Sequence, residues 1–203
     1  EYVATPMTKE MDRCRMAVDL AEEGKTVAMV SSGDSGIYGM AGILLEIANE
    51  KKSSVEIETV PGITAASAAA SVLGAPLMHD FAVISLSDLM TPFNLIMKRV
   101  DCAGQGDMIV CLYNPKSKKR ADYVEKAADI LMIYRDESTP VGVVRHAGRA
   151  EQSSYITTLG ELKDAPIDMF SIVIIGNSNT YVKDGKMITP RGYEDKYGFA
   201  NVD

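Results

Sequence analysis

The sequence predicts an α/β protein, and three observations carry that prediction. Segments patterned like buried strands alternate with segments whose apolar residues recur every three or four positions, as in amphipathic helices. The chain has 203 residues, enough for one large domain or two small ones with a real core. Hydrophobic residues make up 46% and charged residues 24% of the chain, which are ordinary values for a globular protein.

The first half of the chain predicts an opening helix followed by two strand-helix units. We expect helices over residues 6–23, 37–49 and 63–73, and strands over 26–31 and 55–60. Two parallel strands are too few for a stable sheet, and the sequence opens with Glu1 rather than Met. We therefore expect a first domain that lacks one or more N-terminal strands, or one whose sheet is completed by another chain.

The second half predicts a larger sheet. Expected strands cover residues 81–86, 108–113, 141–145, 154–158 and 171–176, and expected helices cover 91–102 and 121–134. Asp184-Gly185 predicts a two-residue hairpin turn between short final strands. Because Gly74-Ala75-Pro76 interrupts the pattern, we place the domain boundary at residue 77, giving domains 1–77 and 78–203.

Composition argues against several classes of function. The formal net charge of -7 disfavours nucleic-acid or anionic-membrane partners, and the absence of Trp disfavours base stacking. Cys14, Cys102 and Cys111 are odd in number and form no C-x-x-C pair, so we expect neither disulfides nor a zinc site. This cysteine usage predicts a reduced, cytoplasmic compartment. Residues 59–78 carry no charged side chain and are long enough to span a membrane, but Pro61-Gly62 and Gly74-Ala75-Pro76 interrupt them. We therefore interpret this stretch as a loop followed by a buried helix.

Ser31-Ser-Gly-Asp-Ser-Gly-Ile-Tyr-Gly39 lies where an expected strand meets an expected helix, the end at which α/β sheets bind ligands. Its three glycines, spaced by three, allow close backbone approach. No Gly-Lys-Ser/Thr follows, so the loop is not a Walker phosphate loop. Asp34 would repel a phosphate and would suit ribose hydroxyls, an amine or a cation. The alternative is that Asp34 only caps the next helix.

Two further loops show ligand-binding features. In Val60-Pro-Gly-Ile-Thr-Ala-Ala66, Thr64 and Ala65 begin a helix whose free N–H groups point outward, although tight packing of a small-residue helix is the alternative. Lys116, Lys118, Lys119 and Arg120 place four cations before a helix start, which invites an anionic ligand, although a solvated basic face is the alternative.

The fourth loop, Val143-Val-Arg-His-Ala-Gly-Arg149, ends a strand. Arg145 and Arg149 could hold carboxylates. His146 and His79, the two histidines, could act as a general acid or base, with plain polar surface as the alternative. No Ser/His/Asp motif, H-E-x-x-H motif or metal-ligand cluster is present in the sequence. Four such loops at strand ends together predict a ligand cleft between two α/β halves.

Seven segments in this order resemble the tetrapyrrole methylase family, and in particular its precorrin-3B C17-methyltransferase branch. They are V-S-S-G-D-S-G-I-Y-G-M-A-G (30–42), V-P-G-I-T-A-A (60–66), G-A-P-L-M-H-D-F-A-V-I-S-L-S-D-L (74–89), L-Y-N-P-K-S (112–117), V-V-R-H-A-G-R (143–149), T-T-L-G-E-L (157–162) and I-I-G-N-S (174–178). The resemblance covers nearly the whole chain, and S-L-S-D and L-Y-N-P are the segments typical of that branch.

The resemblance implies two α/β domains with S-adenosyl-L-methionine in the cleft between them. The implied cofactor contacts are Ser32, Gly33, Asp34, Ile37, Thr64, Ala65, Asn114, Ala147, and either Phe170 or Ser171. The implied reaction is methylation of C17 with contraction of the macrocycle, on precorrin-3B or its cobalt-bearing counterpart, in cobalamin biosynthesis. The many carboxylates of such a substrate would suit Lys116, Lys118, Arg145 and Arg149. The resemblance assigns no catalytic residue and no metal, and we expect a homodimer.

Two other functions fit the same residues. A sister tetrapyrrole methylase could act at another carbon, such as C11, and a non-catalytic α/β protein could bind the ligand without turnover. The sequence also departs from the family, since the opening strand and its G-x-G-P-G-like loop are absent. On that ground we expect a fragment that folds but binds the cofactor poorly.

Overall fold

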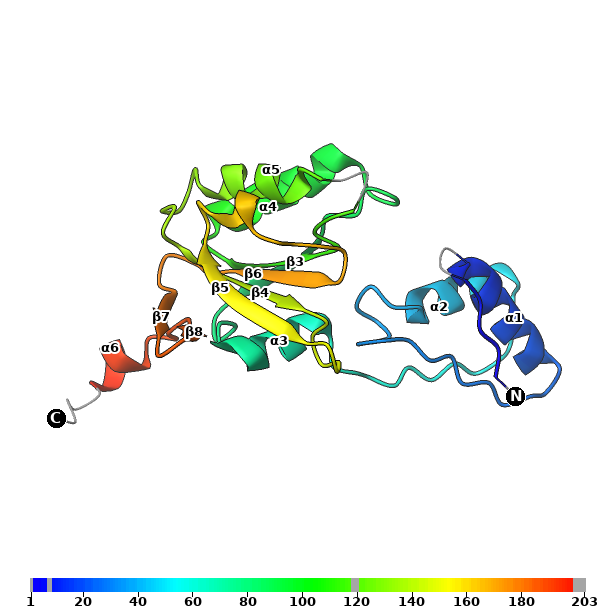
Figure 1. Ribbon diagram of the computed structural model, residues 1–203. Helices are drawn as coiled ribbons and strands as arrows, with labels where there is room; N and C mark the ends of the chain where they lie inside the picture. Colours follow the sequence, from blue (N-terminus) through cyan, green and yellow to red (C-terminus); the bar gives the residue numbers. More distant parts are fainter. Residues whose placement is uncertain (1, 7–8, 118–120, 199–203) are drawn as a thin grey trace. The chain divides into compact units, whose positions relative to one another are not determined.

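The computed structural model describes residues 2–6, 9–117 and 121–198 (Figure 1). Its contacts divide the chain into an N-terminal unit, residues 1–64, and a C-terminal unit, residues 65–203. This division differs from the predicted boundary at residue 77. The reason is that α3 (Ala65–Leu73) packs on strands of the C-terminal unit, and β1 (Gly74–Ala75) pairs with a strand near the end of the chain.

The N-terminal unit contains two helices and two extended segments. Helices α1 (Glu10–Glu22) and α2 (Ala41–Glu50) pack together around a core of buried residues, Cys14, Val18, Met40, Ile47 and Ala48. Gly24, with φ 85°, ends α1 as the sequence predicts. Residues 26–31 and 55–60 are extended, but the predicted strands do not form, because neither segment joins a ladder in the described chain. The expected helix at 37–49 begins later, at Ala41.

The C-terminal unit is built on a five-stranded mixed sheet. Its strands are β2 (Phe81–Ser85), β3 (Ile109–Tyr113), β4 (Pro140–Arg145), β5 (Ser153–Thr158) and β6 (Ser171–Ile175), in the order β2-β3-β6-β4-β5. The pair β2–β3 is parallel, whereas β6 runs antiparallel to both β3 and β4. The carboxyl ends of β2, β3 and β4 therefore lie at the same edge of the sheet as the start of β6.

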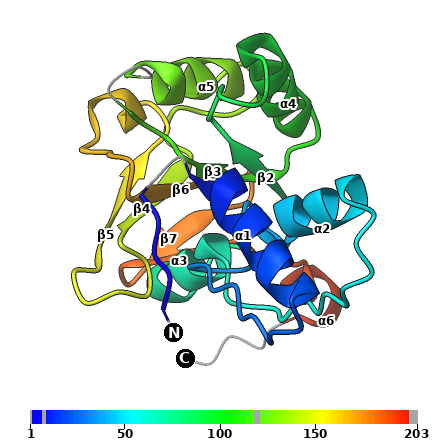
Figure 2. The ribbon, with the colours of Figure 1, turned by 90° about the vertical axis from the view of Figure 1, so that its right-hand side faces the viewer.

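Helices cover both faces of this sheet, as Figures 1 and 2 show. Helices α4 (Phe93–Gln105) and α5 (Tyr123–Leu131) cover one face, against residues such as Leu112 and Val173. Helix α3 covers the other face, against residues such as Cys111 and Ile174. Because successive residues of a strand point to opposite faces, a sheet covered on both sides needs continuous apolar strands. This explains runs such as Ile109–Tyr113 and Ser171–Ile175.

The rest of the C-terminal unit includes a small second sheet. Strands β7 (Tyr181–Lys183) and β8 (Lys186–Ile188) form the predicted hairpin, and β1 pairs with β8 in parallel. Asp184 and Gly185 both have positive φ, 50° and 71°, as a type I′ turn requires. The short elements β1, η1 (Leu162–Asp164) and α6 (Tyr193–Tyr197) were not predicted. No helix in the described part of the chain is long and apolar enough to cross a membrane.

Arg135 is a buried cation that joins three parts of the C-terminal unit. Its guanidinium donates hydrogen bonds to the carbonyl oxygens of Gly176, at 2.5 Å, and of Met108, at 2.6 Å. It also reaches the carbonyl of Ala103, at 3.3 Å. Burial lowers the pKa of Arg135, and the nearby Asp107 carboxylate opposes that effect. The side chain therefore acts as a structural tie between α4, β3 and the end of β6.

Candidate functional site

The loop that follows the first extended segment is organised by the Asp34 carboxylate. Oδ1 accepts hydrogen bonds from the backbone N–H groups of Gly36, at 2.8 Å, and Ile37, at 3.0 Å. Oδ2 accepts one from the N–H of Gly62, at 2.9 Å. Asp34 thus closes its own loop and ties it to the Pro61-Gly62 turn that follows the second extended segment.

These hydrogen bonds also set the charge of the loop. The N–H of Gly62, followed by that of Gly36, lowers the pKa of Asp34 below its ordinary value of 3.8, because the donors favour the ionised form. An ionised carboxylate offers about four acceptor positions, and the three N–H groups leave about one on Oδ2. The loop therefore presents a fixed negative charge with room for one more donor.

The alternative role for Asp34, as the cap of the following helix, is wrong. Helix α2 begins at Ala41, its N-cap is Met40, and no side chain caps it. Asp34 lies well before that position and bonds to the N–H groups of its own turn instead. Its role in the structure is to shape the loop and join it to Gly62.

Backbone contacts hold the two loops of the N-terminal unit together. A Cβ at Gly62 would lie 2.1 Å from the carbonyl oxygen of Gly33, so this approach requires glycine. The Ser35 hydroxyl donates to the carbonyl of Val60, at 2.9 Å. These contacts join the two loops, which the sequence predicts as ligand-binding loops, into one local structure.

Apolar side chains surround the Asp34 loop without being buried. Ile37 is 42% exposed and Tyr38 56%, while Val60 and Ile63 are 69% and 72% exposed. Tyr38 also has positive φ, 54°, an unusual backbone conformation for a bulky residue. The other predicted contacts of this unit are Ser32 and Gly33, which are exposed, and Thr64, which is half-buried. A carboxylate among exposed apolar groups suits a ligand that is cationic in one part and apolar in another.

In the C-terminal unit, the predicted ligand residues gather at one edge of the five-stranded sheet. Asn114 follows β3, Ala147 follows β4, and Ser171 begins β6, with Arg145 and Ser171 paired in register. The topology, rather than closeness in sequence, brings them to the same edge. Ala147 is half-buried, and Ser171 is buried.

Asn114 is held in place by its neighbour at the end of β2. It has positive φ, 50°, and its side-chain amide donates to the Ser85 hydroxyl at 2.9 Å. Strained residues held by their surroundings are typical of functional sites. Ser85 belongs to the S-L-S-D segment but was not predicted as a site residue.

The start of α3 is tied to the same strand. The N–H of Ala66 donates to the Tyr113 hydroxyl at 2.8 Å, and Tyr113 is the residue before Asn114. The half-buried Ala65 therefore lies at a helix N-terminus that is fixed to the end of β3. Sequence reasoning missed Tyr113, because an aromatic residue at a strand end carries no distinctive signal.

A polar cluster forms where β4 ends and β6 begins. The Nε of Arg145 lies 2.6 Å from the Asp168 carboxylate, which also accepts the Ser171 hydroxyl at 2.9 Å. Partial burial alone would raise the pKa of Asp168, but hydrogen bonds from Arg145, Ser171 and the N–H of Phe170 outweigh it and lower that pKa. His146, with φ 52°, stacks on Phe170 with ring centroids 4.8 Å apart.

This cluster revises the expectation for the predicted basic residues. Arg145 is already paired with Asp168, a partner that lies 23 residues away in sequence and was not predicted. Lys116 is half-buried and Arg149 is exposed, so both keep part of their side chain near solvent. Lys118 lies outside the described residues, as do Lys119 and Arg120.

Comparison with proteins of known sequence identifies two informative relatives. The chain is 52% identical, over 193 residues, to the "Probable cobalt-factor III C(17)-methyltransferase" of Salmonella typhimurium, covering 95% of this chain and 80% of that protein. It is 47% identical to the "Cobalt-factor III methyltransferase" of Priestia megaterium, covering 97% of this chain but only 37% of that longer protein.

The fold is also similar to a solved structure. The crystal structure of the methyltransferase CobJ matches with a TM-score of 0.86 and 36% identity, covering 92% of this chain and 79% of that one. The model of the Tetrapyrrole (Corrin/Porphyrin) Methylases matches residues 4–163, which include the Asp34 loop, the Pro61-Gly62 turn and the ends of β3 and β4. The chain therefore belongs to the tetrapyrrole (corrin/porphyrin) methylases.

Proposed function

We propose that this protein is an S-adenosylmethionine-dependent methyltransferase of cobalamin biosynthesis that methylates C17 of cobalt-factor III, with contraction of the macrocycle. One observation carries the proposal: 52% identity across 95% of the chain to a relative whose name specifies that substrate and that carbon. The cobalt-bearing substrate is favoured over precorrin-3B because the P. megaterium relative also carries cobalt-factor III in its name.

The Asp34 loop fits the proposed cofactor. S-adenosylmethionine supplies an electrophilic methyl group on a cationic sulfonium. Asp34 remains ionised at neutral pH and keeps about one acceptor position on Oδ2, so it can receive an amine or hydroxyl donor. The exposed side chains of Ile37 and Tyr38 add apolar surface beside it. Ser32, Gly33, Thr64 and Ala65 complete the proposed contacts around the two loops.

The strand-end residues of the C-terminal unit supply the remaining proposed cofactor contacts. Asn114 is oriented by Ser85, and Ser171 by Asp168, so both polar groups are held before any ligand binds. Ala147 offers a small side chain that permits close backbone approach. Preorganised groups of this kind lower the entropy cost of binding.

The basic residues are the proposed contacts for the substrate carboxylates. Lys116, Lys118 and Arg149 are proposed as direct ligands. For Arg145 we propose that Asp168 orients the guanidinium through Nε, which leaves its other N–H groups for a carboxylate. Methyl transfer by displacement depends mainly on alignment and on exclusion of water, so the proposal assigns no nucleophile and no general base.

The decisive experiment is a turnover assay of the purified protein with cobalt-factor III and methyl-labelled S-adenosylmethionine. We expect one labelled methyl group per product, located at C17 by NMR, together with the contracted ring. Label at C11 or another carbon would instead support a sister methylase. Calorimetric binding of S-adenosylmethionine without any transfer would support the non-catalytic ligand carrier.

Two further parts of the proposal concern the state of the protein. We propose that it works in the cytoplasm as a homodimer. All three cysteines are free, with Cys14 and Cys111 buried, which suits a reducing compartment. Sedimentation equilibrium tests the dimer, and fractionation of cells that express the protein tests the location.

A further inference from the structure

The loop between β2 and α4, residues 86–92, lies beside the strand end that carries Asn114. Leu86 is buried, and its N–H donates to the carbonyl of the last β3 residue at 2.9 Å, which extends the β2–β3 pairing by one residue. The Ser85 hydroxyl accepts the N–H of Ser87 at 3.2 Å as well as the Asn114 amide. One hydroxyl therefore joins the start of this loop to a proposed cofactor contact.

A second set of contacts fixes the middle of the loop. The hydroxyl of Tyr123, the first residue of α5, donates to the Asp88 carboxylate at 2.8 Å. The Tyr123 ring packs on Phe93, the first residue of α4, with ring centroids 4.6 Å apart. The Lys126 ammonium lies 5.2 Å from the Phe93 centroid and pairs with Asp122 at 2.6 Å. The loop is thus attached to the sheet at its start and to both helices at its centre.

Two large apolar side chains of this anchored loop lie outside the core. Leu89 is 78% exposed and Met90 is 94% exposed. Single exposed apolar residues are common, but these two are neighbours in a loop whose backbone is fixed on the residue before them, Asp88. Covering such a pair with an apolar ligand is favourable, because its surface is removed from water without any reordering of the loop.

We propose that Leu89 and Met90 form an apolar platform on which one face of the tetrapyrrole macrocycle rests. Tyr123, acting through Asp88, is the positioning residue that holds this platform. The inference rests on the proposed function and deepens it. A macrocycle with an apolar face and a rim of carboxylates needs apolar side chains beside cations. Lys116 supplies such a cation, three residues past the end of the neighbouring strand β3.

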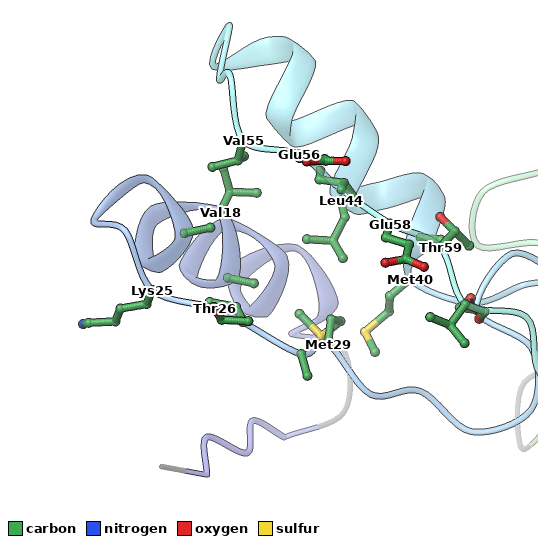
Figure 3. Close-up of a pocket in the computed structure, with 18 of the residues that line it drawn as sticks. Val18, Lys25, Thr26, Met29, Met40, Leu44, Val55, Glu56, Glu58 and Thr59 are labelled. Carbon is green, nitrogen blue, oxygen red and sulfur yellow. Dashed lines mark hydrogen bonds between the residues drawn. The ribbon is translucent and has the colours of Figure 1, made fainter.

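The charges of the N-terminal unit favour this location as well. Its pocket, which Figure 3 shows between the two extended segments, has Lys25, Glu56 and Glu58 as its charged lining residues. Their net charge is negative, which disfavours a substrate that is itself rich in carboxylates. The platform lies instead beside a strand end that is followed by a lysine.

The test measures binding of cobalt-factor III to the whole protein by absorbance titration, without S-adenosylmethionine, so that no turnover occurs. The double variant Leu89→Ser, Met90→Ser should raise the Kd for the tetrapyrrole about tenfold or more, because two apolar contacts are lost. This loss should persist at high salt, unlike that of Lys116→Gln, which acts through a screened charge. The apolar exchange Leu89→Met, Met90→Leu should keep the wild-type Kd, as should the control Ile133→Ser, at a position 71% exposed.

A second variant tests the positioning residue. Tyr123→Phe removes the hydroxyl but keeps the ring on Phe93. We expect the KM for the tetrapyrrole to rise severalfold with kcat little changed, because the platform contacts substrate and transition state alike. Hydrogen exchange should accelerate in residues 87–91. Tyr134→Phe, which loses a similar hydrogen bond to Asp101 of 2.6 Å, should change neither the KM nor that exchange.

The outcomes separate the platform from the proposed function. An unchanged tetrapyrrole Kd in the serine double variant would overturn the platform and leave the proposed function standing, whereas a wild-type protein that binds no cobalt-factor III would overturn both. An equal weakening of S-adenosylmethionine binding would assign the loop to the cofactor site instead. A change in sedimentation without a change in the tetrapyrrole Kd would make the loop a contact between copies. An unchanged KM in Tyr123→Phe would overturn the positioning role.

Discussion

In the C-terminal unit every strand of the main sheet is paired and both faces are covered by helices, whereas in the N-terminal unit two strand-like segments have no ladder partner in the described chain. The C-terminal unit has a large core, in which many side chains are 0% exposed, including those of Leu131 and Ile174. In the described part of the N-terminal unit, a small buried cluster that includes Cys14, Val18 and Ile47 lies around α1 and α2. The Asp34 loop therefore belongs to the unit with the smaller buried core.

This difference matters for ligand binding, because local stability follows the density of buried contacts. The polar groups at the C-terminal sheet edge are fixed by strands that cannot easily move. The Asp34 loop is fixed mainly by its own hydrogen bonds to Gly36, Ile37 and Gly62. Changes to the C-terminal unit should thus alter global stability, and changes to the N-terminal unit should alter local order and cofactor binding.

The largest expected effect comes from a matched pair of core deletions, one in each unit. Ile174→Ala should lower the free energy of unfolding by about 4 kcal/mol, because a rigid sheet between helices cannot collapse into the cavity. Ile47→Ala, equally buried, should cost about 2 kcal/mol, because its neighbours on α1 and the extended segments can relax. Urea unfolding measures both losses in free energy, and equal losses would contradict the proposed difference in rigidity between the two cores.

Next in size is the loss of the buried guanidinium. Arg135→Met should destabilise the C-terminal unit by about 3 kcal/mol, since three carbonyl groups lose a charged donor inside the protein. Hydrogen exchange should accelerate in β3 and β6 but not in α1. Arg99→Met, at an exposed position on α4, is the matched control and should change the stability little. Faster exchange in both units would mean that they unfold together.

The sequence predicted the C-terminal unit better than the N-terminal one, for a physical reason. Strands such as Ile109–Tyr113 carry their own signal, because burial on both faces demands an unbroken apolar run. Residues 26–31 carry a similar, largely apolar run, and residues 55–60 alternate like a strand with one solvated face. Pairing, however, depends on a neighbouring strand that a local pattern cannot supply.

The candidate site shows the same limit of sequence reasoning. Asp34 and Asn114 stand out in loops, but the partners that orient them, Gly62 and Ser85, are 28 and 29 residues away. The pairing of Arg145 with Asp168 depends on the antiparallel register of β4 and β6. Such partners follow from topology, which a single sequence does not display.

A third, smaller effect tests the Asp34 loop directly. Asp34→Ala should weaken S-adenosylmethionine binding by about 5- to 150-fold in Kd, through loss of a charged acceptor and of loop order. Exchange at Gly36 and Gly62 should accelerate while β2 to β6 stay unchanged. Asp136→Ala removes a similar turn carboxylate in the C-terminal unit and should leave cofactor affinity intact. Unchanged affinity in Asp34→Ala would limit Asp34 to shaping the loop.

A weaker effect is expected for the basic residues near β3. Lys116→Gln should raise the KM for the tetrapyrrole severalfold and flatten its dependence on salt, since a screened attraction to carboxylates is lost. The Kd for S-adenosylmethionine should hardly move. Lys163→Gln, an exposed lysine after β5, is the control of equal charge change. If both variants behave alike, the basic segment acts only through net charge.

The smallest effect is a pH dependence confined to the N-terminal unit. The folded pKa of Asp34 lies below 3.8, so the stabilisation from its ionised form is present at neutral pH and is lost as the pH falls through the folded pKa. We expect the amide NMR signals of Gly36, Ile37 and Gly62 to shift together in that acidic window. The same signals should show no such step in Asp34→Asn, which cannot ionise.

Signals at the C-terminal sheet edge should follow a different acidic transition, that of Asp168, whose pKa is also lowered but whose main partner is Arg145. A single shared transition for both groups would show that the two units respond to protonation as one body, and the contrast between them would then be limited to their cores.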